Sequence, residues 1–388
     1  MKVLHLISSP KWTGPAVPTV NLCRELKKQG IYIDIAVSQY PGKPLSAIHG
    51  KLLDKVNEAG LVHRTDLQLQ AKTFNFSWLS DLSKLRSDIK SKRYDLIHTN
   101  LAHDTNLVSI ASIGFEKLTP IVYTHHTIHP WRNDLWHKYI ITKKIDLVIT
   151  RYLDACEDFH KRFSLGEDKV ISISPGIDLS VIPEEISSDK IRSELGIEPD
   201  DLVIGMVARM QPKRDYETLL KAAALLHPKY PKLKVILIGS GEVSKSIENK
   251  IYEMQLQDVV VMAGFRHDDY WEALNMLEAK ILTAPGSDAS CRAVLEAMAL
   301  GIPVVAANMG VLPELLDKGK CGILFEPGNS ESLSDAIVPI LEDSNYRKSL
   351  GKSSKYRVKT HYQINNQAKV LIENYKNIDV KKIKPISS

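Results

Sequence analysis

At 388 residues, with 44% hydrophobic and 25% charged residues, the chain has the composition of a globular protein and the length of two ordinary domains. Its net charge of +5 is too small to indicate nucleic acid as a partner. Residues 1–7 are too few for a signal-peptide core, and no run of 18 apolar residues predicts a membrane-spanning helix.

Short apolar segments alternate with helical patterns in the first half of the chain, which favours a parallel sheet covered on both faces. The helical pattern is clearest over residues 77–92. The predicted strands of this half are Val3–Ile7, Ile33–Val37, Leu96–His98, Ile121–Tyr123 and Leu147–Ile149.

The pattern changes near residue 177, where a polar stretch rich in Pro, Ser and Glu predicts a linker with a short helix up to about residue 201. A second series of strands follows, at Val203–Val207, Val235–Ile238, Val259–Val261, Ala279–Leu282 and Pro303–Ala306. The predicted fold is therefore α/β, with two doubly wound, Rossmann-like domains facing one another across a cleft. We place these domains at residues 1–186 and 187–359, with a C-terminal helix at about 360–378 crossing back to the first.

Two properties of the whole chain bear on its location. The four cysteines lack paired spacing, so we expect a reduced, cytoplasmic protein without zinc. Residues 1–186 hold 24 Lys and Arg against 20 Asp and Glu. This small surplus leaves open a peripheral contact with the inner face of the membrane, an anionic acceptor, or ordinary surface charge.

Ligands of open α/β sheets bind beyond the carboxyl ends of the strands, where several segments of this chain carry candidate chemistry. Gly14 follows the first strand and would let a phosphate approach the backbone, although an ordinary turn explains it equally. The absence of a Gly-x-Gly-x-x-Gly pattern here disfavours a nicotinamide or flavin enzyme. Arg209, Lys213 and Arg214 follow the first strand of the second half, and suit a diphosphate or form a solvated basic turn.

Histidines follow two strands of the first half. His125 and His126 are adjacent and lack the spacing of metal ligands, so we expect no metal site. One histidine of this segment is expected to contact the transferred group. His98 and His103 are candidates for the acceptor side, with packing or helix capping as the alternative.

The segment 285–305 is the most informative part of the chain. A polar loop enters a helix, with Asp288 before the helix and Glu296 two turns inside it. Free backbone amides flanked by two carboxylates can hold an anion and the hydroxyl groups beside it. A sugar attached to a nucleoside diphosphate presents this combination.

Together these segments resemble the retaining glycosyltransferases of family 4, which have the two-domain GT-B fold. The most specific match is to the pattern Leu-Glu-Ala-Met-Ala-x-Gly-x-Pro-Val-Val-Ala, found here at 295–306. The resemblance covers effectively the whole chain and is thinner in the first half. Further matches are Pro175–Asp178, Gly239–Gly241, Gly264–Phe265, Asn308–Glu314 and Gly322–Gly328.

The resemblance implies a role for each matching residue. Arg209 and Arg214 would hold the donor diphosphate, Glu296 the ribose, and Asp288 and His126 the transferred sugar. The other expected donor-binding residues are Gly14, Lys213, Gly264, Phe265, Arg266, Ala289, Ser290, Cys291 and Arg292.

The chain departs from the family pattern at five positions of the donor site. Asp288 replaces the usual Glu, residues 289–291 read Ala-Ser-Cys in place of Gly-Phe-Gly, and Arg214 replaces the usual Lys. These differences leave the sugar and the base of the donor open.

The predicted function is a metal-independent, retaining transferase that moves a sugar from a nucleotide-diphosphate sugar to an acceptor hydroxyl without a cofactor. A saccharide or lipid-linked acceptor, in surface polysaccharide or lipopolysaccharide synthesis, is expected by analogy. The alternatives are a nucleotide-sugar epimerase of the same fold and a non-catalytic nucleotide-sugar-binding homologue.

Overall fold

The computed structural model describes residues 1–9, 12, 14–39, 50–70, 76–115, 118–127, 130–285 and 288–383. The chain forms two compact units. Unit 1 comprises residues 1–176 and 364–388, and unit 2 comprises residues 177–363. The sequence placed the boundary slightly later, between residues 186 and 187.

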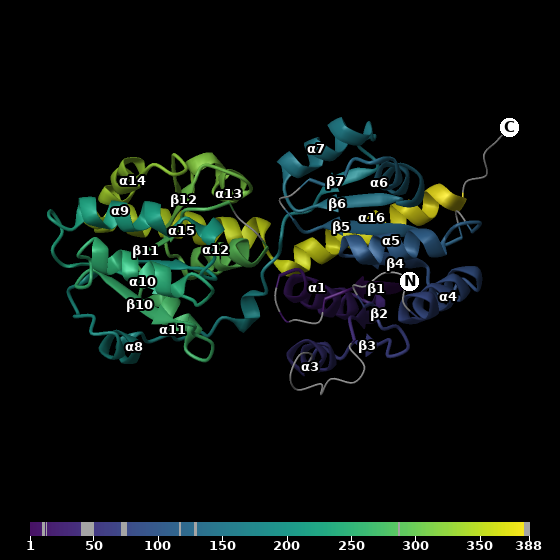
Figure 1. Cartoon of the computed structure of the whole chain (residues 1–388), viewed down its shortest axis with the longest axis horizontal. Helices are drawn as coiled ribbons and strands as arrows, with labels where there is room; N and C mark the ends of the chain where they lie inside the picture. The colour runs from purple at the N-terminus through teal and green to yellow at the C-terminus, as the bar shows by residue number, and fades with distance from the viewer. Residues whose placement is uncertain are drawn as a thin grey trace. The chain divides into compact units, whose positions relative to one another are not determined.

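Unit 1 is built on a parallel sheet of seven strands in the order β3-β2-β1-β4-β5-β6-β7 (Figure 1). Most strand residues are buried, because helices cover both faces of the sheet. The strands are β1 (Lys2–Ile7), β2 (Tyr32–Val37), β3 (Val62–His63), β4 (Leu96–Thr99), β5 (Ile121–His125), β6 (Leu147–Thr150) and β7 (Val170–Ser172).

The last helix of the chain, α16, belongs to unit 1 and packs against α1 (Figure 1). Tyr375 on α16 is fully buried, and its hydroxyl contacts Nδ1 of His98 at 2.5 Å. A Cβ atom on Gly176 would collide with the backbone of Ile364, so glycine lets the two passes of the chain lie close. The helices of unit 1 are α1 (Ala16–Lys28), α3 (Gly50–Glu58), α4 (Phe76–Lys90), α5 (Ala102–Ala111), α6 (Leu135–Tyr139) with the π-helical turn Ile140–Lys144, α7 (Leu153–Phe163) and α16 (Ile364–Ile383).

Unit 2 has a parallel sheet of six strands in the order β10-β9-β8-β11-β12-β13. The strands are β8 (Leu202–Val207), β9 (Leu233–Ile238), β10 (Val260–Gly264), β11 (Ala279–Leu282), β12 (Val304–Ala307) and β13 (Ile323–Phe325). The helices are α8 (Asp189–Glu194), α9 (Tyr216–Leu226), α10 (Ser244–Glu253), α11 (Tyr270–Asn275), α12 (Asp288–Leu300), α13 (Leu312–Leu315), α14 (Ser330–Glu342) and α15 (Ser344–His361).

The strand order reverses direction once in each sheet, between β1 and β4 in unit 1 and between β8 and β11 in unit 2. Such reversal points leave a crevice at the carboxyl ends of the strands, where doubly wound proteins bind ligands. The two architectures agree with the α/β prediction. They also place the loops after β1, β4 and β5, and after β8 and β11, at candidate sites.

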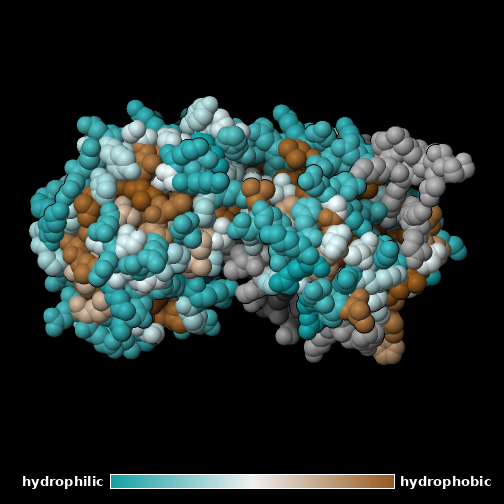
Figure 2. Space-filling model, turned by 90° about the horizontal axis from the view of Figure 1, so that it is seen from above, coloured by the Kyte–Doolittle hydropathy of each residue, from teal (hydrophilic) through white to brown (hydrophobic). Residues whose placement is uncertain are grey.

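Within the described ranges, no helix is long and apolar enough to cross a membrane. The face seen in Figure 2 carries mostly hydrophilic residues, interrupted by separate hydrophobic spots. The larger exposed apolar side chains include Leu135, Trp136 and Tyr139, all on α6.

Candidate active site

In unit 2, the loop after β8 carries Arg209, whose side chain is exposed. The backbone on both sides of Arg209 is fixed by the neighbouring strand: the amide of Ala208 donates to the carbonyl of Ile238 at 3.1 Å. The amide of Met210 donates to the carbonyl of Ser240 at 3.0 Å. This pairing holds Arg209 at the carboxyl end of the sheet.

Two glycines make that close pairing of loops feasible. A Cβ atom on Gly239 would collide with the carbonyl oxygen of Ala208, and one on Gly241 with that of Met210. Gly239 also has a φ of +140°, which other residues rarely adopt. The Gly-x-Gly turn is therefore required by the position of the Arg209 loop.

Arg214 ends a 3₁₀ turn that leads into α9, and its side chain is buried. The next residue, Asp215, has a left-handed backbone (φ +47°) and caps α9 by accepting from the amide of Thr218 at 3.3 Å. The Arg214 carbonyl accepts a hydrogen bond of 2.8 Å from Thr283 Oγ1, at the end of β11. Burial lowers the pKa of the Arg214 guanidinium from its usual value. Lys213, in contrast, is exposed.

Glu296 lies in the middle of α12 and is 3% exposed. Its Oε2 accepts from the Tyr270 hydroxyl at 2.5 Å, and its Oε1 accepts from Nε of Arg292 at 2.7 Å. The carboxylate therefore has a fixed orientation before any ligand binds.

The start of α12 differs from the prediction. Asp288 is the first residue of the helix itself, so the prediction that it precedes the helix is wrong. Cys291 is buried in the first turn. The side chains of residues 288–290 lie outside the described part of the structure.

The end of β10 and the loop after it carry three predicted donor residues. Gly264 has a φ of +71°, and Phe265 is 69% exposed. Arg266 forms ion pairs with Glu194 at 2.6 Å and with Asp269 at 2.9 Å. Because its guanidinium is committed to these partners, Arg266 could bind a donor only after breaking them.

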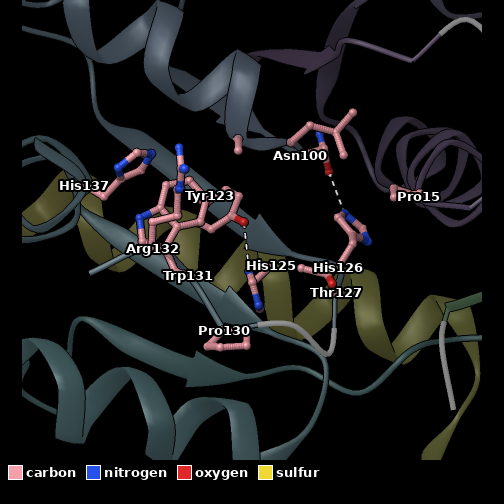
Figure 3. Close-up of a pocket in the computed structure, with 12 residues that line it drawn as sticks. Pro15, Asn100, Tyr123, His125, His126, Thr127, Pro130, Trp131, Arg132 and His137 are labelled. Carbon is pink, nitrogen blue, oxygen red and sulfur yellow. Dashed lines mark hydrogen bonds between the residues drawn. The ribbon is translucent and has the colours of Figure 1, made fainter. Parts of the chain in front are cut away.

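Unit 1 contains a cavity of about 300 Å³ at the carboxyl ends of β4 and β5 (Figure 3). On one side of it, Nε2 of His126 contacts Oδ1 of Asn100 at 3.1 Å. The Asn100 amide donates to the carbonyl of Leu6 at 3.0 Å, which fixes its oxygen toward the histidine. Because an amide oxygen can only accept, Nε2 of His126 is the donor in this hydrogen bond.

The other side of the cavity is aromatic and basic (Figure 3). Trp131 packs between Tyr123, at 4.8 Å between ring centroids, and His137, at 5.6 Å. Arg132 is exposed beside them. Sequence reasoning missed Trp131, Arg132 and His137; an aromatic residue next to a basic one, just after a strand-end loop, was the available signal.

The remaining predictions in unit 1 have mixed outcomes. His98 is 1% exposed, and both ring nitrogens are bonded, to the hydroxyls of Tyr375 and Thr124. Burial lowers the pKa of His98 well below its usual value. These contacts support the packing alternative for His98, and its contact with an acceptor stays a prediction.

His103 and Gly14 are compatible with a site without demonstrating one. His103 is half-buried in the first turn of α5 and lies outside the cavity lining. Gly14 has a φ of +54° and open space around it, and the adjacent Pro15 lines the cavity. His129, a third histidine of the segment after β5, lies outside the described residues. Within the described ranges, no group of three or more His, Cys, Asp or Glu residues could hold a metal ion.

Comparison with known proteins gives matches to both units. Residues 187–357 match the family described as Glycosyl transferases group 1, and residues 12–181 match Glycosyltransferase Family 4. An uncharacterized glycosyltransferase of Methanocaldococcus jannaschii is 27% identical over 94% of both chains. The D-inositol 3-phosphate glycosyltransferase of Corynebacterium glutamicum is 24% identical over 89% of this chain and 88% of its own.

Solved structures share the fold over nearly the whole chain. HepE of Anabaena, crystallised in complex with UDP, has a TM-score of 0.79 at 21% identity and covers 97% of this chain and 100% of its own. A glycosyltransferase of Rickettsia africae has a TM-score of 0.81 at 18% identity, covering 97% and 98%. Both units have the fold and the family matches expected of a GT-B enzyme, and the chain belongs to the group 1, family 4 glycosyltransferases.

Proposed function

We propose that the protein transfers a sugar from a nucleotide-diphosphate sugar to an acceptor hydroxyl, with retention of the anomeric configuration. The observation that carries the proposal is the buried, pre-oriented carboxylate of Glu296. A carboxylate fixed by Tyr270 and Arg292 is a suitable acceptor for the two hydroxyls of a ribose. The HepE structure was determined with UDP bound, which supports a nucleotide ligand for this fold.

The leaving group of this reaction is a nucleoside diphosphate, on which negative charge grows as the glycosidic bond breaks. Arg209 is exposed on the loop after β8, and Arg214 follows it on the same segment. Fixed guanidinium groups can bind a diphosphate in bidentate fashion and stabilise that charge. The proposed reaction therefore requires neither a metal ion nor a cofactor.

Our proposal for the mechanism has no covalent enzyme intermediate. We expect the acceptor oxygen to bond the anomeric carbon on the face from which the phosphate leaves. The departing phosphate oxygen takes the acceptor proton, and His126 contacts the transferred sugar.

The unit 1 cavity is our candidate for the acceptor. An aromatic side chain such as Trp131 can pack against the apolar face of a sugar ring or cyclic polyol, and a few polar groups then fix its orientation. Arg132 adds a positive charge for an anionic substituent. The curated relative from Corynebacterium is named for D-inositol 3-phosphate, which makes a phosphorylated polyol the first acceptor to test.

A saccharide or lipid-linked acceptor used in surface polysaccharide or lipopolysaccharide synthesis is the other proposed class. The apolar side chains of α6 favour a lipid-linked acceptor, because Leu135 is 89% exposed and the rings of Trp136 and Tyr139 stack beside it. Exposed Trp, Tyr and Leu next to Lys138 suit the surface of an anionic membrane. Co-sedimentation with anionic vesicles tests this contact, and equal sedimentation of Leu135→Ser/Trp136→Ser would refute it.

The main experiment measures nucleoside diphosphate release and the stereochemistry of the product. Wild type is assayed with UDP-, GDP- and ADP-sugars and with D-inositol 3-phosphate, inositol and a lipid-linked saccharide. Arg209→Ala should lower kcat/KM by about 100-fold, since removal of a transition-state donor costs about 3 kcal/mol. Lys352→Ala, an exposed change on α15, is the matched control.

Three results would contradict the proposal. An inverted product by NMR refutes retention, and an unchanged rate in Arg209→Ala refutes the diphosphate assignment. Turnover of the donor without any acceptor indicates an epimerase instead.

A further inference from the structure

Lys280 is a charged residue at a position where a parallel sheet normally has an apolar one. It is the second residue of β11, which lies between β8 and β12 inside the sheet of unit 2. Its side chain is completely buried, and its Nζ has no hydrogen-bond partner within the described part of the chain. An unpartnered buried ammonium is strongly unfavourable, so its presence calls for a compensating role.

The electrostatic neighbours of Lys280 are residues of the proposed donor site. Glu296 and Cys291, on α12, favour its charged form, and Arg214, before α9, opposes it. Burial is the largest influence and lowers the pKa of Lys280 to about 8. These three groups are the titratable and charged residues that act on Lys280, and all three are among the expected donor-binding residues.

We propose that Lys280 belongs to the donor site, where its buried ammonium supplies positive charge for the nucleoside diphosphate. The inference rests on the proposed function. Tyr270 and Arg292 already bind the two oxygens of Glu296, so Lys280 acts through its charge and replaces neither partner. Within the described residues, no hydrogen-bond partner satisfies the Lys280 ammonium. A bound diphosphate supplies negative charge to this part of the site.

This arrangement couples donor binding to a proton. A diphosphate near Arg214 favours the charged form of Lys280, so binding should draw a proton onto Lys280 when the pH is at or above 8. By reciprocity, the affinity for the nucleotide should fall as Lys280 loses its proton. If the bound diphosphate raises the pKa of Lys280 by one, the affinity for the nucleotide should fall about tenfold between pH 7 and pH 9.5.

The test is isothermal titration calorimetry of the full chain with the nucleoside diphosphate that wild type binds, from pH 7 to pH 9.5. At each pH the titration is run in two buffers of different ionisation enthalpy, which measures proton uptake. The variant is Lys280→Met, which keeps the length of the side chain and removes its charge. The matched control is Lys234→Met, the same change on β9 of this sheet, where Nζ donates to the carbonyl of Asp258 at 2.7 Å.

We expect wild type and Lys234→Met to take up a proton near pH 8.5 and to lose about tenfold in affinity over the range. Lys280→Met should bind the nucleotide about tenfold more weakly at pH 7. Its affinity should then not change with pH, apart from the change that the nucleotide's own titration causes. Equal profiles in wild type and Lys280→Met overturn the inference alone. So does the absence of proton uptake by wild type, a result that requires no variant to fold. No binding by wild type at any pH overturns the proposed function as well.

Discussion

Replacing Lys280 by Met should make the protein more stable at neutral pH. The pKa of Lys280 is lowered from 10.5 to about 8 by burial, which corresponds to about 3 kcal/mol of unfavourable free energy for the charged form in the folded state. Methionine has a similar length and carries no charge, so it removes this penalty with little change in packing. For a unit of this size, the melting temperature should rise by roughly 6–12 °C.

The pH dependence of the difference identifies its cause. Below pH 8 both the folded and the unfolded chain hold the Lys280 proton, so the advantage of Lys280→Met is constant. Between pH 8 and 10.5 the folded wild type has lost the proton while the unfolded chain still binds it, so the stability of wild type rises with pH. The advantage of the variant should therefore shrink over this interval.

Urea unfolding followed by circular dichroism, at pH 7, 9 and 10.5, measures the difference. Lys234→Met controls for the loss of a lysine from the sheet. A Lys280→Met protein that is less stable than wild type at pH 7 would refute the reasoning, as would a difference that does not change between pH 8 and 10.5.

Three further predictions concern the loops and unit 1. Gly241→Ala should displace the Arg209 loop and weaken nucleotide binding at least tenfold, because its Cβ atom would collide with the Met210 carbonyl. The control is Gly196→Ala, which has open space around it. Equal nucleotide affinities of the two variants would contradict the argument. Arg132→Gln should raise KM up to about fivefold for an anionic acceptor, since an exposed ion pair contributes at most about 1 kcal/mol, and leave KM for a neutral one unchanged. An equal effect on both would exclude a role in charge recognition. In wild type, the free energy of unfolding should fall as the pH rises from 4 to 7, because burial raises the pKa of Asp104 to about 7 while the unfolded carboxyl ionises near 3.8. Asp104→Asn should remove this fall, and thermal unfolding at pH 4 and 7 measures it.

Much of the fold follows from local pattern. Apolar runs such as residues 203–207 lie within strands, because a parallel strand is buried on both faces and carries few polar residues. Three short strands, β3, β7 and β13, were not predicted. Val62–His63 has only two residues, and Val170–Ser172 and Ile323–Phe325 have three each, so none of them gives a periodic signal.

The site was predictable only where residue type and position coincide. Glu296 could be found because a carboxylate at a fixed spacing in a helix leaves a sequence pattern. The environment of His98 could not, because its burial depends on Tyr375, 277 positions away along the chain. The cavity wall of Trp131 and Arg132 likewise depends on how the segment after β5 folds back.

Unit 1 offers a contrast that strengthens the assignment of Lys280. There, Arg64 is also a buried cation, but its guanidinium donates to Asp66 at 2.7 Å and to Asp88 at 2.9 Å. It also donates to the hydroxyl of Tyr94 at 2.6 Å. Because these hydrogen bonds satisfy the guanidinium within unit 1, no ligand is needed to explain the buried charge of Arg64.

Unit 2 is different. Its described buried charged residues are Asp201, Arg214, Lys280 and Glu296, and three of these four act on one another electrostatically. Within the described residues, the Lys280 ammonium of this cluster has no hydrogen-bond partner. A buried charge without a partner destabilises a folded protein, and sequences keep such conflicts mainly where function requires them. The buried ammonium of unit 2 therefore supports an anionic ligand at the carboxyl ends of β8 and β11.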